Sequence, residues 1–115
     1  MADILVIEDD PEVCRTLFNV LVHSGHRVEV AYDGDKGIEL FKERGLFSMV
    51  ITDIRMLRKD GNEVARYIRN SAEKKDTPVV AITGYLDDVE RDLFNLVLEK
   101  PFKMADVIKI IDSFN

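Results

Sequence analysis

Short apolar runs alternate with longer amphipathic stretches along the whole chain. Five runs are rich in β-branched and aliphatic residues, and they lie at residues 4–7, 28–32, 49–52, 79–82 and 96–98. Nearly continuous apolar runs of this length are typical of strands that are buried on both faces of a parallel sheet. The run at 28–32 contains Glu29 and is the weakest of the five. The pattern therefore predicts five short parallel strands.

Between these runs, apolar residues recur at the spacing of one helix face. The first helix is expected to start at Asp10-Pro11, an N-cap followed by proline at the first helical position, and to end at Gly25. The second is expected to end near Gly45. The apolar positions that indicate the helices are Val13, Leu17 and Leu21 in the first, Ile38 and Phe41 in the second, Val64, Ala65 and Ile68 in the third, and Val107, Ile108 and Ile111 in the fifth. A fourth helix is expected within residues 86–95.

Strand and helix alternate five times, and this (βα)5 order predicts an α/β fold with a doubly wound parallel sheet and helices on both faces. Ligands of such sheets bind beyond the carboxyl ends of the strands. Four of the five predicted strands end in polar or charged residues, namely Glu8-Asp9-Asp10, Asp53, Thr83-Gly84 and Glu99-Lys100-Pro101. Each group alone is more typical of a helix cap, a turn or a loop. Their joint occurrence at one edge of the sheet indicates a functional site.

The carboxylates at this edge predict a metal site. If the first and third strands are neighbours, Glu8, Asp9 and Asp53 share one crevice. Two carboxylates about 4 Å apart repel each other by about 4 kcal/mol at an effective dielectric constant of about 20, and a bound cation relieves this repulsion. Oxygen ligands without histidine or cysteine suit Mg²⁺. With Lys100 and Thr83 nearby, the set describes a phosphoryl-transfer site in which an aspartate is a candidate nucleophile.

Length and composition narrow the class of protein. A chain of 115 residues predicts one domain, residues 1–115, with no room for an appended DNA-binding module. The net charge of −6 argues against nonspecific nucleic-acid binding. The single cysteine excludes an intrachain disulfide and favours a reducing, cytoplasmic setting. No run approaches the about 20 apolar residues of a membrane span, and Met1-Ala2-Asp3 lacks the basic region of a signal peptide.

The polar strand ends also carry a resemblance to a known family. The matching stretches are residues 4–10, residues 49–56, Asp60-Gly61, Thr83-Gly84 and Lys100-Pro101-Phe102. Over nearly the whole chain they closely resemble the response-regulator receiver family, the phosphoacceptor modules of two-component signalling. The resemblance implies a flavodoxin-like sheet with strand order 2-1-3-4-5 and Mg²⁺ as the cofactor. It implies a histidine kinase or phosphotransfer protein as partner, and an output protein or domain that the sequence does not identify.

The resemblance also implies the roles of the acidic residues. Asp53 would accept a phosphoryl group from the phosphohistidine of the kinase. Asp9, Asp53 and the backbone carbonyl of Arg55 would bind Mg²⁺, and Glu8 would act through a water molecule. In the family, the positions two residues after the phosphoacceptor and two after the conserved threonine tune phosphate hydrolysis. Arg55 and Tyr85 stand at these positions, where simple exposure is the alternative interpretation.

For the phosphoryl group itself, the resemblance implies a hydrogen bond from Thr83 and an ion pair with Lys100. The chain departs from the family at Leu57, where proline is common, at Gly84, where alanine is usual, and at Val97, where the family has its switch aromatic. The interval from Thr83 to Lys100 is also several residues shorter than usual, which we interpret as a shortened fourth helix or a shortened loop after it. The phosphate-accepting site is expected to be intact. Tyr85 and Phe94 are the candidates to replace the switch aromatic.

Four further features are not expected to take part in metal binding or phosphoryl transfer. Cys14 is interpreted as a packing or surface residue of the first helix. His23 and His26 are expected at the surface, because no third ligand follows at metal-binding spacing. Residues 74–76, with the sequence Lys-Lys-Asp, are typical of a solvated loop.

Three alternative functions are considered beside the phosphoacceptor. A haloacid-dehalogenase-like, Mg²⁺-dependent phosphatase needs a second aspartate at the position of Arg55. A nucleotide-binding domain needs a glycine-rich first turn, whereas Glu8-Asp9-Asp10-Pro11 repels phosphate unless a metal is bound. A phosphorylation-independent interaction module on the same fold remains open. We expect no enzyme activity beyond the chain's own phosphorylation and dephosphorylation.

Overall fold

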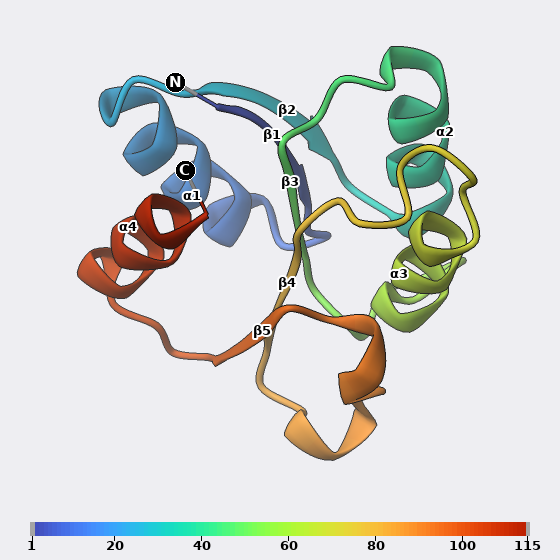
Figure 1. Ribbon diagram of the computed structural model, residues 1–115. Coiled ribbons are helices and arrows are strands. Elements are labelled where there is room, and N and C mark those ends of the chain that lie inside the picture. The colour runs from blue at the N-terminus through green and yellow to red at the C-terminus, as the bar shows by residue number, and fades with distance from the viewer. Residues whose placement is uncertain (1, 115) are drawn as a thin grey trace.

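The structure, a computed structural model, describes residues 2–114. Met1, the first residue of the segment that lacks signal-peptide features, lies outside them. Five parallel strands form one sheet in the order β2-β1-β3-β4-β5 (Figure 1). The strands are β1 (Asp3–Ile7), β2 (Arg27–Ala31), β3 (Met49–Thr52), β4 (Val79–Thr83) and β5 (Leu96–Glu99). Each strand matches a predicted run to within one residue at either end, and the predicted flavodoxin-like order is confirmed.

Helices cover both faces of the sheet. They are α1 (Pro11–His23), α2 (Gly34–Arg44), α3 (Gly61–Arg69) and α4 (Met104–Ser113). Figure 1 shows α1 and α4 together on one face and α2 and α3 together on the other. In β1, Ile4 and Val6 pack toward the α1 and α4 layer, whereas Leu5 and Ile7 pack toward α2 and α3. Because both faces of β1, β3 and β4 are buried, these strands are almost entirely apolar, whereas the edge strand β2 is partly exposed and accommodates Glu29.

The predicted helix ends are confirmed where the sequence carries a cap. The Asp10 side chain accepts a hydrogen bond from the Glu12 N–H at 2.9 Å, and Pro11 is the first residue of α1. Gly25 follows the end of α1 with a φ of +90°, and Gly45 ends α2 with a φ of +66°. Both glycines adopt the left-handed conformation that glycine reaches without a steric penalty.

The segment expected to form a shortened fourth helix is not α-helical. Residues 84–95 contain two short 3₁₀ helices instead, η1 (Leu86–Asp88) and η2 (Arg91–Leu93). These residues alone must cross back over the sheet from the end of β4 to the start of β5, a distance of about 16 Å for a five-residue strand. A crossover that includes an α-helix needs a dozen or more residues. The 12 residues of this interval are at the lower limit of that range and leave little length for an α-helix. The segment lies beside α3 (Figure 1).

The residues that were expected to take no part in the chemistry lie in the core or at the surface. Cys14 is buried in the layer of α1, and burial raises the pKa of its thiol to about 11. His23 is exposed as expected, but His26 is half-buried, because its Nδ1 accepts a hydrogen bond from the Ala2 N–H at 3.0 Å. Residues 74–76 lie in a turn at the surface. None of the helices between residues 2 and 114 combines the length and apolar character that crossing a membrane requires.

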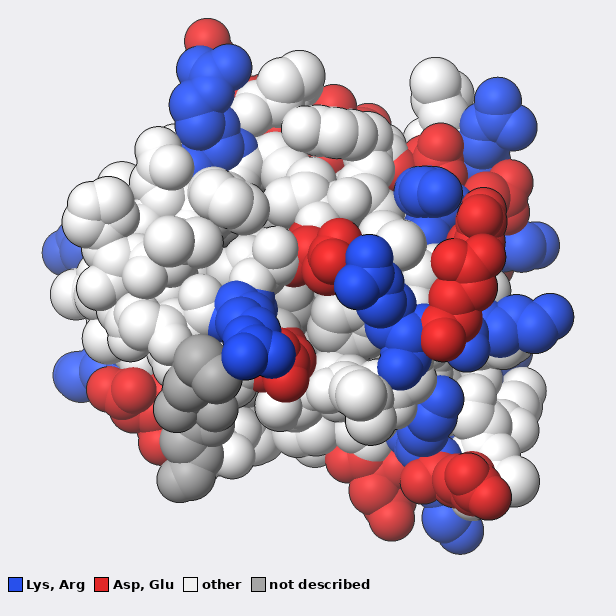
Figure 2. Space-filling model, turned by 90° about the horizontal axis from the view of Figure 1, so that it is seen from above, with Lys and Arg blue, Asp and Glu red and all other residues white. Residues whose placement is uncertain are grey.

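Charge is unevenly distributed over the surface. On the face drawn in Figure 2, lysine, arginine, aspartate and glutamate crowd the half on the side of α2 and α3, and uncharged atoms make up most of the other half. Four of the exposed large apolar side chains belong to α1 and α4, and these are Phe18, Val22, Met104 and Ile108. The two helix layers therefore present surfaces of different polarity.

Candidate functional site

Three carboxylates meet at the carboxyl edge of the sheet. Glu8 and Asp9 follow β1 and Asp53 follows β3, and these two strands are paired so that Ile7 lies opposite Thr52. One carboxylate oxygen from each of the three residues lies within 4.8 Å of the others. Glu8 and Asp53 are buried, whereas Asp9 is exposed. Among residues 2–114 this is the only group of at least three potential metal-ligating side chains at such a spacing.

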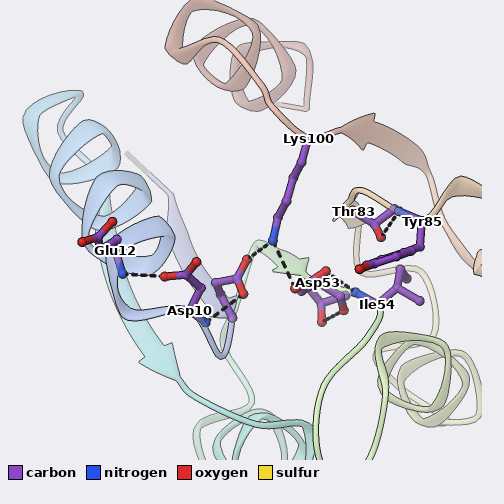
Figure 3. Close-up of polar contacts among 9 residues, drawn as sticks. Asp10, Glu12, Asp53, Ile54, Thr83, Tyr85 and Lys100 are labelled. Atoms are coloured by element: carbon purple, nitrogen blue, oxygen red, sulfur yellow. Dashed lines mark hydrogen bonds and ion pairs between the residues drawn. The ribbon is translucent and has the colours of Figure 1, made fainter.

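Lys100 connects two of these carboxylates. Its Nζ lies 2.7 Å from Glu8 Oε1 and 3.1 Å from Asp53 Oδ2, and Figure 3 shows the side chain reaching across the site from the end of β5. Burial raises the pKa of Glu8 to about 7, although the Lys100 ammonium opposes this rise. Lys100 bonds to Glu8 and Asp53 but not to Asp9, so one ammonium group does not balance the charge of the three carboxylates, and a further cation would relieve their repulsion.

The backbone around Asp53 holds its carboxylate in place. Asp53 Oδ1 accepts a hydrogen bond from the Ile54 N–H at 2.7 Å, while Oδ2 faces Lys100. Gly61 packs against the Asp53 carbonyl so closely that a Cβ at this position would lie 2.1 Å from the carbonyl oxygen. The Asp60-Gly61 pair noted in the sequence is thus explained: Asp60 caps α3, and Gly61 lets the start of α3 approach the site.

Thr83 and its loop form the other side of the site. Thr83 is buried at the end of β4, and its Oγ1 accepts a hydrogen bond from the Tyr85 N–H at 2.9 Å. The Thr83 hydroxyl proton is therefore free of this bond and available for donation. Figure 3 shows the Tyr85 ring lying between Thr83 and Ile54, above the loop that follows Asp53.

Arg55 occupies a separate position beside the acidic residues. Its guanidinium lies 3.6 Å from the centroid of the Tyr85 ring and forms an ion pair with Asp88 of η1. The ion pair raises the pKa of Arg55 above its ordinary value. Arg55, Asp88 and Asp9 all line one cavity of about 660 Å³, which Ile54, Met56, Leu57, Asp60 and Asn62 complete.

The structure thus brings Glu8, Asp9, Asp53 and Lys100 together. Of the candidates for the missing aromatic, Tyr85 lies at the site, whereas Phe94 packs against the core on the α2 and α3 side. Sequence reasoning did not find Asp88, because its partner Arg55 is 33 positions away and no periodic pattern links the two.

The chain is similar to known proteins along nearly its whole length. The sequence model of the response regulator receiver domain family matches residues 4–112. The response regulator receiver protein CpdR of Brucella abortus is 34% identical over an alignment of 120 positions, which covers 98% of this chain and 96% of CpdR. The regulatory protein VanRB of Enterococcus faecalis is 30% identical over 96% of this chain. The chain spans only 50% of VanRB and 35% of the transcriptional regulatory protein DltR of Streptococcus agalactiae.

Solved structures share the fold along their whole length. The response regulator TrrA of Thermotoga maritima, in complex with Mg²⁺ and BeF, is 27% identical with a TM-score of 0.89, and the match covers 100% of both chains. The receiver domain of a sensor histidine kinase from Pseudomonas aeruginosa is also 27% identical with a TM-score of 0.89, covering 98% of this chain and 96% of that one. That structure has a magnesium ion coordinated in its active-site cleft.

Proposed function

Because the chain belongs to the response regulator receiver domain family of two-component signalling, we propose that it accepts a phosphoryl group on Asp53 in a Mg²⁺-dependent reaction. The donor is the phosphohistidine of a histidine kinase or phosphotransfer protein, and the modified chain changes its interaction with an output protein or domain. The observation that carries the proposal is the buried Asp53 carboxylate beside Glu8 and Asp9, with Lys100 bonded to both Glu8 and Asp53.

The donor atoms at the site fit Mg²⁺. They are carboxylate oxygens of Asp9 and Asp53, with no histidine or cysteine among the grouped residues. Together with the backbone carbonyl of Arg55 they would hold the ion, and Glu8 would act through a water molecule. Bound there, Mg²⁺ supplies positive charge to the oxygens of the phosphoryl group during transfer. The magnesium site of the Pseudomonas aeruginosa receiver domain supports this assignment.

The protein groups have distinct tasks in the transfer. An Asp53 carboxylate oxygen attacks phosphorus and forms the acyl phosphate, while the N–P bond of the donor breaks and its electron pair remains on the imidazole. Lys100 pairs with the transferred group, and the Thr83 hydroxyl donates a hydrogen bond to a phosphoryl oxygen. Arg55 and Tyr85 border the site and tune how fast water removes the group.

The chain turns over no substrate other than its own aspartyl phosphate in this proposal. A dehalogenase-like phosphatase is disfavoured, because Arg55 stands where its second aspartate is needed. We propose that residues 1–115 act as one receiver domain in the cytoplasm, where the free thiol of Cys14 is compatible with a reducing environment.

Labelling with a small phosphodonor tests the proposal. Incubation with acetyl phosphate and Mg²⁺ should add about 80 Da, one phosphoryl group, and peptide mapping should place it on Asp53. Asp53→Asn and chelation of Mg²⁺ should each abolish the addition. Asp60→Asn is the control, because Asp60 lines the cavity beside Asp9 but serves to cap α3. This variant should still gain the phosphoryl group. Labelling that persists in Asp53→Asn would show that another residue accepts the group and would overturn the assignment to Asp53. Intact protein that is never labelled would instead favour a phosphorylation-independent module.

A further inference from the structure

The connection between β4 and β5 is attached to the molecule by a series of polar contacts and by Leu93, which is partly buried against the core on the α2 and α3 side. We call residues 85–93 the strap. None of the residues in η1 and η2 is buried. Asn62 of α3 donates from Nδ2 to the Asp88 carbonyl at 2.7 Å and accepts from the Glu90 N–H at 3.0 Å. Arg66 of α3 pairs with both carboxylate oxygens of Glu90, at 2.6 and 2.7 Å. A segment with this little burial is among the first to open in a folded protein.

A further attachment comes from the phosphoacceptor loop instead of α3. The Arg55 guanidinium pairs with Asp88 and stacks on the Tyr85 ring, so one side chain holds both the start of the strap and η1. Tyr85 also donates its N–H to the Thr83 hydroxyl. Arg55 therefore links the loop after Asp53 to the loop that positions Thr83.

The position of Arg55 gives it a second potential partner. Arg55 is two residues after Asp53 and lines the same cavity as Asp9. A phosphoryl group on Asp53 adds a charge of about −1.5 to −2 at this edge of the sheet. Guanidinium binds phosphate oxygens through two parallel N–H bonds. The present pair with Asp88 is exposed, with 58% and 38% of the two side chains accessible, and exposed pairs are weak.

We propose that Arg55 is a shared cation, held by Asp88 in the unphosphorylated protein and drawn to the phosphoryl group when Asp53 is modified. The inference rests on the proposed function and specifies its regulation: phosphorylation detaches η1 from Arg55 and loosens the strap. The device replaces the switch aromatic that the chain lacks at Val97. By linkage, pairing with Asp88 weakens the hold of Arg55 on the phosphoryl group by the same factor by which the phosphoryl group weakens the Arg55–Asp88 pair.

Binding of beryllofluoride with Mg²⁺, a mimic of the phosphoryl group, gives the test. Affinity is measured by titration, and amide hydrogen exchange is measured across residues 85–93. In the unaltered protein, beryllofluoride should accelerate exchange in the strap. Asp88→Asn should bind the mimic about threefold more tightly, the factor expected from loss of a weak exposed competitor. Arg55→Gln should bind more weakly and show no strap response, and adding Asp88→Asn to it should change nothing.

Glu90→Gln is the matched control. It removes one carboxylate from the same strap and breaks the pair with Arg66, but it leaves Arg55 and Asp88 together. It should accelerate strap exchange without changing the affinity for beryllofluoride. Glu90→Gln could also tighten binding as much as Asp88→Asn does. The effect would then come from losing any negative charge of the strap or from loosening the strap itself, and the shared-cation proposal would be wrong.

The two proposals fail in different ways. If the mimic does not bind, or binds Asp53→Asn equally well, the receiver function proposed above fails and the inference fails with it. If the mimic binds at Asp53 but neither strap exchange nor the affinity of Asp88→Asn changes, the receiver function stands and Arg55 is not shared.

Discussion

At the scale of single residues, burial and pairing with Lys100 shift the pKa of Glu8 in opposite directions. Its side chain is almost completely inaccessible, and burial raises its pKa to about 7 despite the hydrogen bond to Lys100 and the one from the Asp10 N–H. Burial lowers the pKa of Lys100, but pairing with Glu8 and Asp53 together outweighs this and the net shift is upward. Pairing therefore favours the charged form of Lys100 and opposes the rise in the pKa of Glu8.

This shift predicts a pH dependence of stability in the metal-free protein. A carboxyl whose folded pKa lies above its unfolded value stabilises the fold when protonated, so the contribution is complete below about 4.5 and is lost as the pH rises to about 7. The unfolding free energy of the unaltered protein should therefore fall, relative to Glu8→Gln, across this interval in EDTA. Denaturant unfolding at several pH values measures the difference. Glu12→Gln, at an exposed position, should show no such trend, and a gap that stays constant would contradict the prediction.

The place of Asp9 among the three grouped carboxylates predicts how the stability of the protein responds to Mg²⁺. At a Mg²⁺ concentration tenfold above its dissociation constant, binding to the folded state adds about 1.4 kcal/mol, or about 5 °C in melting temperature. Asp9→Asn should raise the metal-free melting temperature, because a repelling charge is lost, and should remove most of the Mg²⁺ response. Thermal melts in EDTA and in excess Mg²⁺ give both values.

Asp10→Asn is the control for this experiment. Asparagine caps a helix as well as aspartate does, so the variant removes one neighbouring charge and keeps the cap of α1. Its Mg²⁺ response should equal that of the unaltered protein. A full response in Asp9→Asn would show that the ion binds elsewhere.

At the scale of elements, α3 joins the site to the rest of the fold. Its first residue, Gly61, touches the Asp53 backbone, and its buried face carries Val64 and Ile68. Its polar face holds the strap through Asn62 and Arg66. One short helix thus positions the loop after Asp53 at one end and the strap along its side.

The cap of α3 predicts a measurable loss of stability. Asp60 and Glu63 form a reciprocal capping box, in which each side chain accepts from the backbone N–H of the other residue. Asp60→Ala should lower the unfolding free energy by about 1 kcal/mol and the melting temperature by about 4 °C. Asp33→Ala, which removes the N-cap of α2, should cause a similar loss, and both variants should still respond to Mg²⁺. A capping role is refuted if Asp60→Ala melts like the unaltered protein.

At the scale of the whole molecule, the sheet depends on both helix layers. Ile111 of α4 is buried in the layer shared with α1, whereas Ile108, one turn earlier, is 38% exposed. Ile111→Ala should lower stability by about 2–5 kcal/mol, because it leaves a cavity in the core. Ile108→Ala should lower it far less, since substitutions at accessible positions usually change stability by about 0.5 kcal/mol. Urea denaturation of both variants checks the difference, and equal losses would contradict the assigned faces of α4.

Local patterns in the sequence determined the strands, four of the helices, the caps and the edge of the sheet that carries the site. They succeed because alternation of burial and helix capping are decided by residues within one or two turns of each other. The polar residues after each strand identified Glu8, Asp9, Asp53, Thr83 and Lys100 as candidates, because parallel strands place their carboxyl ends at one edge.

The tertiary structure alone decided which polar side chains pair. Lys100 reaches Glu8 across 92 positions, and Arg55 reaches Asp88 across 33. Such partners depend on the path of the crossovers, and no local period records that path. The same holds for residues 84–95: their place between two predicted strands led to the expectation of a helix, but the span they must bridge and the contacts offered by α3 produced two 3₁₀ turns. Tertiary context overrides local helix preference here, because the positions of β4 and β5 in the sheet fix the distance that the connection must cover.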